Sequence, residues 1–335
     1  MFLMRTWKQV FLSTAVQILV TGVAPPRPPS GGSRVFPLCR AMSTLMLGGE
    51  GLRKRFYEKA GVLESKDGRG WQVHLDGKAI KTPAKNPLFL PSPDLAHAIA
   101  VEWQFQDAQH IRPFTMPIFS MAATVTDVYP LPNHRVRVID ALVSFLPSDA
   151  ACCRHETEDY EGDHSGVQND KDADDHADPV RASLLFASSS REENSQTNKL
   201  RHIQDSAFDP LIRHINSRLG VEMVASTNLW GAEHRGDAVQ GVRGFLQGLS
   251  DWELGLMEEL CRATKSMVIS FAFFTDAIDC DEAIRLTRLE EEYQIQKWGM
   301  VEGGHDIDRC NLEARLAAAA VIKGLIRRMT VSGPA

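Results

Sequence analysis

The sequence lacks the short motifs that carry the commonest catalytic and nucleotide-binding chemistry. It contains no G-x-x-x-x-G-K-[ST] phosphate loop, no G-x-G-x-x-G fingerprint, no G-x-S-x-G nucleophile turn and no H-E-x-x-H metal pair. The segment DGKAIKT, residues 76–82, resembles part of a phosphate loop, but it falls in a predicted hairpin and lacks the first glycine. We therefore expect no nucleotide or other cofactor.

Cysteine is scarce and shows no pattern. The six cysteines among 335 residues form no C-x-x-C pair and no other metal-ligand spacing. This argues against a structural metal site and favours a reducing compartment, in which most of them are small buried apolar residues. The length allows two domains, and a hydrophobic content of 43% with 24% charged residues is typical of a globular chain.

Acidic residues are absent from the first 49 positions, which carry five Lys or Arg residues and are rich in Ser, Thr and Ala. This composition is typical of an organelle transit peptide. The apolar run Val10–Ala24 is a competing feature, since it resembles a secretory core but is too short and too polar for a membrane span. We interpret residues 1–53 as a targeting leader followed by a Pro/Gly-rich linker, and the cysteines favour the mitochondrion.

The chain also lacks a basic stripe of the kind that grips nucleic-acid phosphates. Its net charge of −6 comes largely from ten acids between Glu156 and Asp178. Residues 156–205 show little apolar periodicity, which predicts a disordered acidic insert. His164 and His176 lie among these aspartates, but a solvated loop is a better interpretation than a metal site because nothing rigid would fix the ligands.

Residues 54–155 predict a small α/β domain. Alternating apolar residues around a strong Asp76-Gly77 turn signal indicate a strand hairpin. A helix is expected to follow, with Ser92 as its N-cap and an apolar residue at every fourth position. Such a stripe gives its members a structural role. The stripe consists of Leu95, Ile99 and Trp103.

The rest of the chain predicts helices. Two short ones are expected within residues 115–130 and 135–147, and another is expected to end at Gly220. The apolar run SMVISFAFF, residues 266–274, favours a buried helix over a strand. The expected fold class is α+β, with the strand-rich N-terminal domain followed by a helical bundle over residues 206–328. The last predicted helix carries Leu312, Leu316, Ala319, Ile322 and Ile326 on one side.

The stretch RLEEEYQIQKWG, residues 288–299, is the strongest candidate for a functional site. If it continues the preceding residues as one helix, it has a core stripe and a second stripe about 140° away that mixes acid with a large aromatic. Gly299 is a plausible end of the helix, and Asp279 or Asp281 could cap its start. The core stripe is Leu286, Leu289 and Tyr293, and the second is Glu291, Gln294 and Trp298.

Three interpretations of this stretch stay open. Its acids could form a solvated polar face. Glu290 or Glu291 could act as a general acid–base, with His305 or Asp306 as the second group. Alternatively, the stretch could be a contact surface, in which an acid anchors a Lys or Arg of a partner while Trp298 covers apolar area.

Six segments in a specific order complete the pattern. They are RFYEKAGV from Arg55, VHLDGKAIKTPAKNPLFLPS from Val73, AIAVEWQFQ from Ala98, FTMPIFSMAATVTD from Phe114, FDPLIRHINSRLGV from Phe208 and LEEEYQIQKWG from Leu289. Together they resemble the family of mitochondrial ATP-synthase assembly chaperones that handle the free alpha-subunit. The acidic insert and the stretch DAACCRHE depart from the family pattern, so no role is assigned to Cys152 or Cys153.

The resemblance implies a chaperone that binds the unassembled alpha-subunit of the ATP synthase catalytic head and prevents its aggregation before the beta-subunit joins. It implies no catalysis, no metal, no nucleic acid and no stable membrane insertion, and it is compatible with a monomer in the mitochondrial matrix or, alternatively, the plastid stroma. Glu290 or Glu291 matches the family's important acidic position, and Gln294 and Trp298 complete the predicted partner surface. Trp103 matches a family tryptophan.

Two other functions remain as alternatives to this chaperone. One is a hydrolase that uses paired carboxylates, which would need a deep pocket in which Glu290 or Glu291 faces a second acid or a histidine. The other is a general assembly scaffold for respiratory complexes with a different client. A flat or shallow surface around the acids would favour a protein-binding role.

Overall fold

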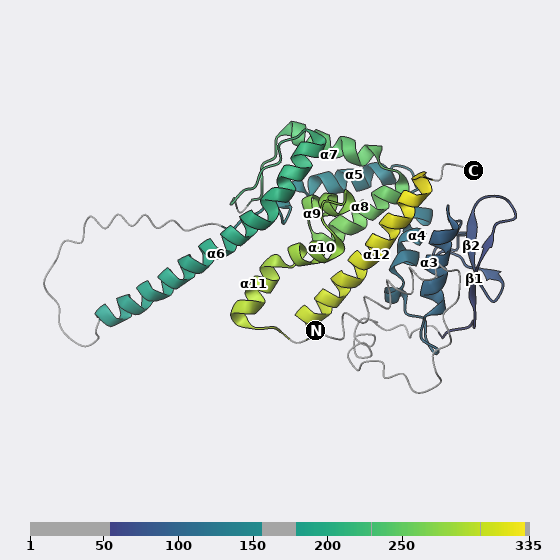
Figure 1. The fold of residues 1–335 in the computed structure, drawn as a ribbon, viewed down its shortest axis with the longest axis horizontal. Coiled ribbons are helices and arrows are strands. Elements are labelled where there is room, and N and C mark those ends of the chain that lie inside the picture. Colours follow the sequence, from purple (N-terminus) through teal and green to yellow (C-terminus); the bar gives the residue numbers. More distant parts are fainter. Residues whose placement is uncertain (1–53, 156–178, 229, 302, 332–335) are drawn as a thin grey trace. The chain divides into compact units, whose positions relative to one another are not determined.

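A computed structural model describes residues 54–155, 179–228, 230–301 and 303–331 (Figure 1). Most of these residues are helical and the strands form one small antiparallel sheet, so the fold is α+β as predicted. The elements are β1 (Ala60–Glu64), β2 (Trp71–Leu75), β3 (Lys78–Ala79), α3 (Pro93–Gln104), η1 (Pro113–Thr115), α4 (Pro117–Asp127), α5 (His134–Ser144), η2 (Leu146–Ser148), α6 (Pro179–Leu219), α7 (Gly236–Gly248), α8 (Asp251–Thr264), α9 (Met267–Phe274), α10 (Cys280–Thr287), α11 (Leu289–Trp298) and α12 (His305–Val331).

The chain divides into two compact units that interleave in sequence. Unit 1 holds residues 54–135, 251–256 and 307–331 of the described chain. Unit 2 holds the described residues between 136 and 250 and between 257 and 306. The domain boundaries expected at 155 and 206 do not coincide with these units, because most of α12 and the start of α8 belong with the N-terminal elements.

The sheet of unit 1 is built around a tight turn. β2 pairs antiparallel with β1 on one side and with β3 on the other, and Val62 lies opposite Val73. The predicted turn at Asp76 and Gly77 has φ angles of 47° and 83°, which aspartate tolerates and glycine adopts freely. The Asp76 carboxylate accepts two main-chain N–H groups that precede β1, and these bonds lower its pKa.

Helix α3 packs on β1 and β2 and follows the predicted pattern. Ser92 Oγ accepts the N–H of Leu95 at 3.2 Å, and Pro93 occupies the first helical position, where its missing N–H costs nothing. Leu95 and Ile99 are fully buried. The burial of these two side chains agrees with a structural role for the stripe.

A buried carboxylate joins α3 to α4. Glu102 accepts the N–H of Ile118 at 2.8 Å and the N–H of Phe119 at 2.7 Å, two donors that the first turn of α4 leaves without helical partners. Burial nevertheless raises the pKa of Glu102 to about 8.

Helix α9 forms the buried centre of unit 2. All residues from Met267 to Phe273 are buried, so the apolar run is the buried helix that the sequence favoured. Ser266 caps the helix by accepting the N–H of Ile269 at 3.0 Å. The fully buried Asp149 accepts both the Ser266 hydroxyl and the Met267 N–H at 2.6 Å. Helices α6 and α10 pack against α9.

The second part of the predicted disordered insert is helical. Helix α6 begins at Pro179, so the expectation of disorder is wrong for residues 179–205, while residues 156–178, with His164 and His176, lie outside the described residues. The spacing of the buried residues explains the error, because it extends the helical pattern upstream of residue 206. The end of α6 is as predicted, with Gly220 at φ 66°. The buried residues are Leu200, Gln204, Phe208, Leu211, Ile212 and Ile215.

Helix α12 carries the last predicted stripe, and all five of its predicted members are buried. Most of this helix lies in unit 1. No helix in the described part of the chain combines the length and the apolar character needed to cross a membrane.

Candidate functional site

The stretch 288–299 does not continue the preceding helix. α10 begins with Asp279 as its N-cap and ends at Thr287, and α11 begins at Leu289 after a break at Arg288, where φ is −101° and ψ is 10°. The prediction of one continuous helix is therefore wrong at this residue, while Asp279 as cap and Gly299 as the stop, at φ 87°, are confirmed. Of the expected core stripe, Leu286 and Leu289 are buried and Tyr293 is half-buried.

Arg288, the residue at the break, has a side chain that is only 5% exposed, so its charge needs acids around it. Its Nη2 lies 2.8 Å from Glu291 Oε1, and its Nε lies 3.1 Å from Glu292 Oε1. Glu291 therefore compensates a buried cation and helps to hold α11 against α10. The charge of Glu291 is therefore paired with Arg288 and adds little attraction for a partner protein.

Glu290 is held differently. Its side chain is exposed, and its Oε1 accepts a 2.6 Å hydrogen bond from Gln204 Nε2 on α6. Gln204 is 1% exposed, and its Oε1 accepts the main-chain N–H of His155 at 2.9 Å. The donor to Glu290 is a neutral amide, so the carboxylate is positioned without being neutralised.

A second buried arginine lies on the α6 side of this region. The Arg154 side chain is fully buried, with Asp205 at 3.2 Å and Asp209 at 3.1 Å. Its guanidinium also donates to the carbonyl of Ala151 and lies 5.1 Å from the ring centroid of Phe208. Two acids one turn apart on α6 thus hold the segment that follows η2.

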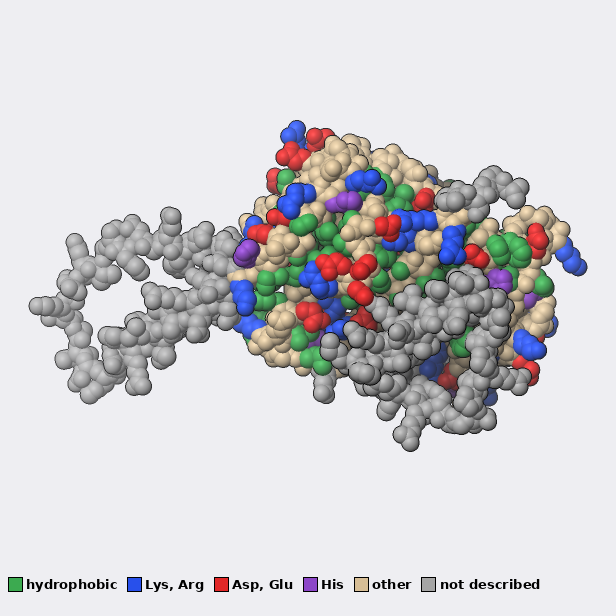
Figure 2. Space-filling view, in the orientation of Figure 1, with side chains coloured by type: hydrophobic (Ala, Val, Ile, Leu, Met, Phe, Trp, Pro, Cys, Tyr) green, Lys and Arg blue, Asp and Glu red, His purple; other side chains and the backbone are tan. Residues whose placement is uncertain are grey.

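These side chains form one surface where α11 packs on α6, and we call it the acidic face. Two of its arginines, Arg154 and Arg288, each bond two acids of the surface, and Arg201 bonds Asp205 at 2.9 Å. Five acids against three arginines leave it net negative. Figure 2 shows that acidic, basic and hydrophobic side chains are mixed on the face of the molecule that it draws. The acidic face comprises Arg154, Arg201, Asp205, Asp209, Arg288, Glu290, Glu291 and Glu292.

The C-terminal end of α11 exposes a cluster of large apolar residues. Trp298 is 70% exposed, and Met300 and Val301, just past the helix, are 57% and 62% exposed. Lys297 Nζ lies 4.9 Å from the Trp298 ring centroid, and Gln294 is exposed one turn earlier. The acid and the indole of the predicted contact surface are therefore both accessible to a partner.

Trp103, by contrast, lies in packed surroundings. Its ring meets Tyr57 edge-on at 5.7 Å and Phe119 at 5.2 Å between centroids, and its carbonyl accepts the Tyr57 hydroxyl at 2.7 Å. These contacts support the structural role predicted with Leu95 and Ile99.

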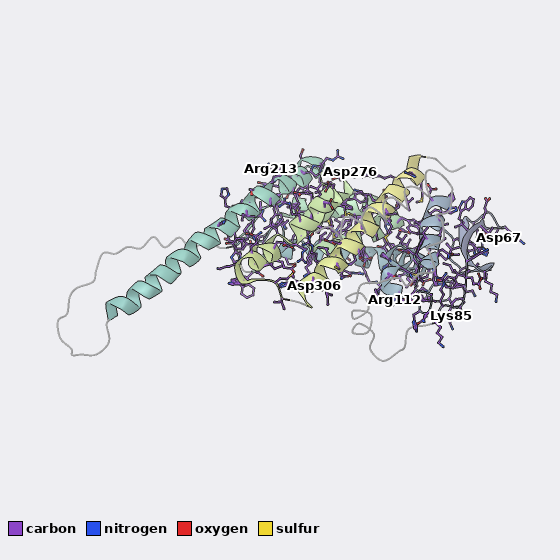
Figure 3. The ribbon with its side chains drawn as sticks, turned by 60° about the horizontal axis from the view of Figure 1, so that its bottom comes forward. Asp67, Lys85, Arg112, Arg213, Asp276 and Asp306 are labelled. Atoms are coloured by element: carbon purple, nitrogen blue, oxygen red, sulfur yellow. The ribbon has the colours of Figure 1, made fainter. Side chains whose placement is uncertain are left out.

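The contacts of the acids do not assemble a general acid–base pair. Glu290 and Glu291 bond Gln204 and Arg288, and neither bonds His305 or Asp306, which stand at the start of α12 (Figure 3). The ring of His305 instead accepts the N–H of Val301 at 3.3 Å. Within the described residues, no group of three or more His, Cys, Asp or Glu side chains is placed to hold a metal ion.

Sequence reasoning missed the α6 half of the acidic face, because it assigned residues up to 205 to the insert. Gln204 sits four residues before Phe208, and Leu200 four before that, so the helical period itself indicated an earlier start. The pairs of Arg154 carry no comparable signal, since this arginine and its acids are about 50 residues apart in sequence.

Residues 54–216 match the family described as ATP12 chaperone protein. Over these residues the chain is similar to the ATP12 chaperone family. It is 24% identical over 263 residues to "Protein atp12, mitochondrial" of Schizosaccharomyces pombe, covering 77% of this chain and 78% of that protein. It is 21% identical over 292 residues to "Protein ATP12, mitochondrial" of Saccharomyces cerevisiae, covering 80% and 83%.

The ATP12 fold is also found among solved structures. The crystal structure of Atp12 from Paracoccus denitrificans matches with a TM-score of 0.60 at 22% identity, covering 80% of this chain and 97% of that one. The match to the ATP12 chaperone model confirms the resemblance seen in the six segments and supports the expected class of function, a chaperone of ATP synthase assembly.

Proposed function

We propose that this chain is a chaperone that binds the unassembled alpha-subunit of the ATP synthase catalytic head and keeps it from aggregating until the beta-subunit joins. A subunit awaiting its partner exposes an apolar face, and such a face is an aggregation hazard. A protein that covers it needs an accessible apolar anchor and a polar surround that orients the encounter. The exposed Trp298 next to the acidic face supports this proposal more than any other observation.

Within this surface, Glu290 is the acid that recognises a basic side chain of the client. Glu291 is committed to the buried Arg288, and replacing it would leave that cation without one of its two acids. Glu290 bonds a neutral amide and keeps its full charge at an exposed position. Gln294 and Trp298, farther along α11, supply the polar and apolar contacts beside it.

The relatives from both yeasts are named mitochondrial, which supports a mitochondrial location for this chain. We place its work in the matrix, where a soluble catalytic head would be assembled. A plastid stroma has no comparable support. Protein binding without catalysis agrees with the chaperone family, and the contacts of Glu290 and Glu291 favour no hydrolytic pair.

The proposal is tested by binding of the purified unassembled alpha-subunit to the wild-type protein and to Glu290→Lys. The reversal places a cation where we expect the client's own cation, so the affinity should fall about tenfold, equivalent to about 1.4 kcal/mol. The melting temperature should fall by only a few degrees, since Glu290 compensates no buried charge but the buried Gln204 amide loses its acceptor, and the affinity is compared well below the melt.

Glu233→Lys is the matched control, because Glu233 is an exposed acid of the same unit outside the acidic face. It should leave the affinity unchanged. Equal losses for the two variants would reduce the effect to net charge and remove Glu290 from the contact. Capture of beta-subunit or another respiratory protein instead of alpha would replace the client named here.

A further inference from the structure

We propose that Gln204 is a positioning residue, which holds the Glu290 carboxylate in a fixed orientation for a lysine or arginine of the client. The inference rests on the proposed function, because it concerns the same surface. Gln204 lies on α6 and Glu290 on α11, so the contact reaches across two elements that are 86 positions apart in sequence.

The orientation of the Gln204 amide follows from its surroundings. The N–H of His155 can only donate, so the group that faces it must be the amide oxygen, and the two are 2.9 Å apart. The amide nitrogen is then turned toward Glu290 Oε1, at 2.6 Å. Because Gln204 is buried, it has little freedom to adopt another rotamer. The main chain at His155 therefore sets the direction of the hydrogen bond that Gln204 donates to Glu290.

The main chain that orients Gln204 is itself anchored. The carbonyl of His155 accepts Arg201 Nη1 at 3.1 Å, and the N–H of Arg154 donates to the carbonyl of Ser226 at 2.8 Å. The buried guanidinium of Arg154 binds two acids of α6. Gln204 therefore transmits the position of a rigid segment to an exposed carboxylate.

The neutrality of this support matters for recognition. An arginine in the place of Gln204 would bind Glu290 more strongly, but it would also cancel the charge that attracts the client. An amide donor occupies Oε1 alone and leaves Oε2 to accept a client ammonium or guanidinium. Fixing the side chain in advance also removes part of the ordering cost of binding.

The experiment is a double-mutant cycle of Gln204→Met and Glu290→Gln, read by the affinity for purified alpha-subunit. Methionine keeps the length of the side chain and removes both hydrogen bonds. Gln204→Met should weaken binding about threefold to tenfold in the wild-type background. It should cause no further loss in the Glu290→Gln background, because no charged carboxylate remains to be positioned.

A second readout needs no client. NMR relaxation of the Glu290 Cγ methylene in the free protein should show greater mobility in Gln204→Met. If that variant loses its folded spectrum, Gln204→Asn, whose shorter amide cannot span His155 and Glu290, takes its place in both measurements.

The outcomes distinguish the positioning role of Gln204 from the proposed alpha-subunit client. An equal loss of affinity in both backgrounds would give Gln204 a purely structural role and overturn the inference, as would unchanged Glu290 mobility. If Glu290 becomes mobile but the wild-type protein does not bind alpha-subunit at all, the contact is as described and the proposed client is wrong.

Discussion

Glu102 should make the stability of the protein fall as the pH rises from about 5 to about 8. Its carboxyl is buried, and burial raises its pKa from 4.5 to about 8 even though two main-chain N–H groups of α4 donate to it. In the unfolded chain the carboxyl ionises at its ordinary pKa, so the unfolded state loses its proton first as the pH rises. The stability contributed by the protonated form is complete below the unfolded pKa and is lost as the pH rises through the folded one.

The size of the effect follows from the two pKa values. Each pH unit between them is worth about 1.4 kcal/mol of unfolding free energy for a single group. Between about pH 5 and about pH 7.5 the loss should therefore be about 3 kcal/mol. That is a substantial share of the roughly 5–15 kcal/mol that stabilises an ordinary domain.

Urea denaturation at a series of pH values measures this loss, with Glu102→Gln as the reference because its amide cannot ionise. The variant should be less stable at low pH, since its amide nitrogen faces a main-chain N–H, but its stability should depend less on pH. The difference between the two slopes is the quantity to compare, because burial also raises the pKa of Asp149 and contributes in the same direction. If wild type and variant lose equal free energy over this range, Glu102 is ionised in the folded protein and the reasoning fails.

Three further substitutions test other parts of the structure. Gly231→Ala should cost about 2 kcal/mol or more in a thermal melt, since φ is 99° and the new Cβ would lie 2.3 Å from the carbonyl oxygen of Pro147; an unchanged midpoint would mean that this loop is free to move. Asp149→Ala should cost about 3 kcal/mol in urea denaturation, because it strips the acceptor from the Ser266 hydroxyl and from the start of α9. Trp298→Ala should leave the melting temperature unchanged and weaken alpha-subunit binding about tenfold; a drop in stability with unaltered binding would make the indole a structural group.

The parts of the fold that the sequence predicted are those in which local signals agree with one another. In α3, a serine N-cap, a proline at the first position and an apolar stripe all indicate the same helix, and Leu95 and Ile99 are buried accordingly. The turn at Asp76-Gly77 was equally predictable, because few residue pairs accept two positive φ angles in succession.

The parts that were missed have two causes. Pairs of an arginine with acids three and four residues ahead also form in a continuous helix, so nothing within residues 280–299 indicates the break at Arg288. The partner of Glu290 was missed because Gln204 lies 86 positions away in sequence and because composition assigned it to a disordered insert, although its spacing from Phe208 fits a helix. The accessibility of Trp298 was expected, because the signal for it is local: the helix ends at Gly299, directly after the tryptophan.

Two carboxylates of the acidic face are held in different ways, Glu291 by a buried arginine and Glu290 by a neutral amide, and this difference suits the first to stability and the second to recognition. Glu291 pairs with a cation buried at the helix break, so exchanging that partner for a client cation would leave the desolvated Arg288 with Glu292 alone. Glu290 can accept a client cation without giving up its bond from Gln204, because the two ligands use different oxygens. A single charge-assisted hydrogen bond of this kind contributes about 1.5–3 kcal/mol, which adds specificity but does not by itself make a complex permanent. If the client is the one proposed, which must be released to the beta-subunit, such a contact is suited to the task, since an acid already paired with arginine would add no attraction and a buried one would slow release.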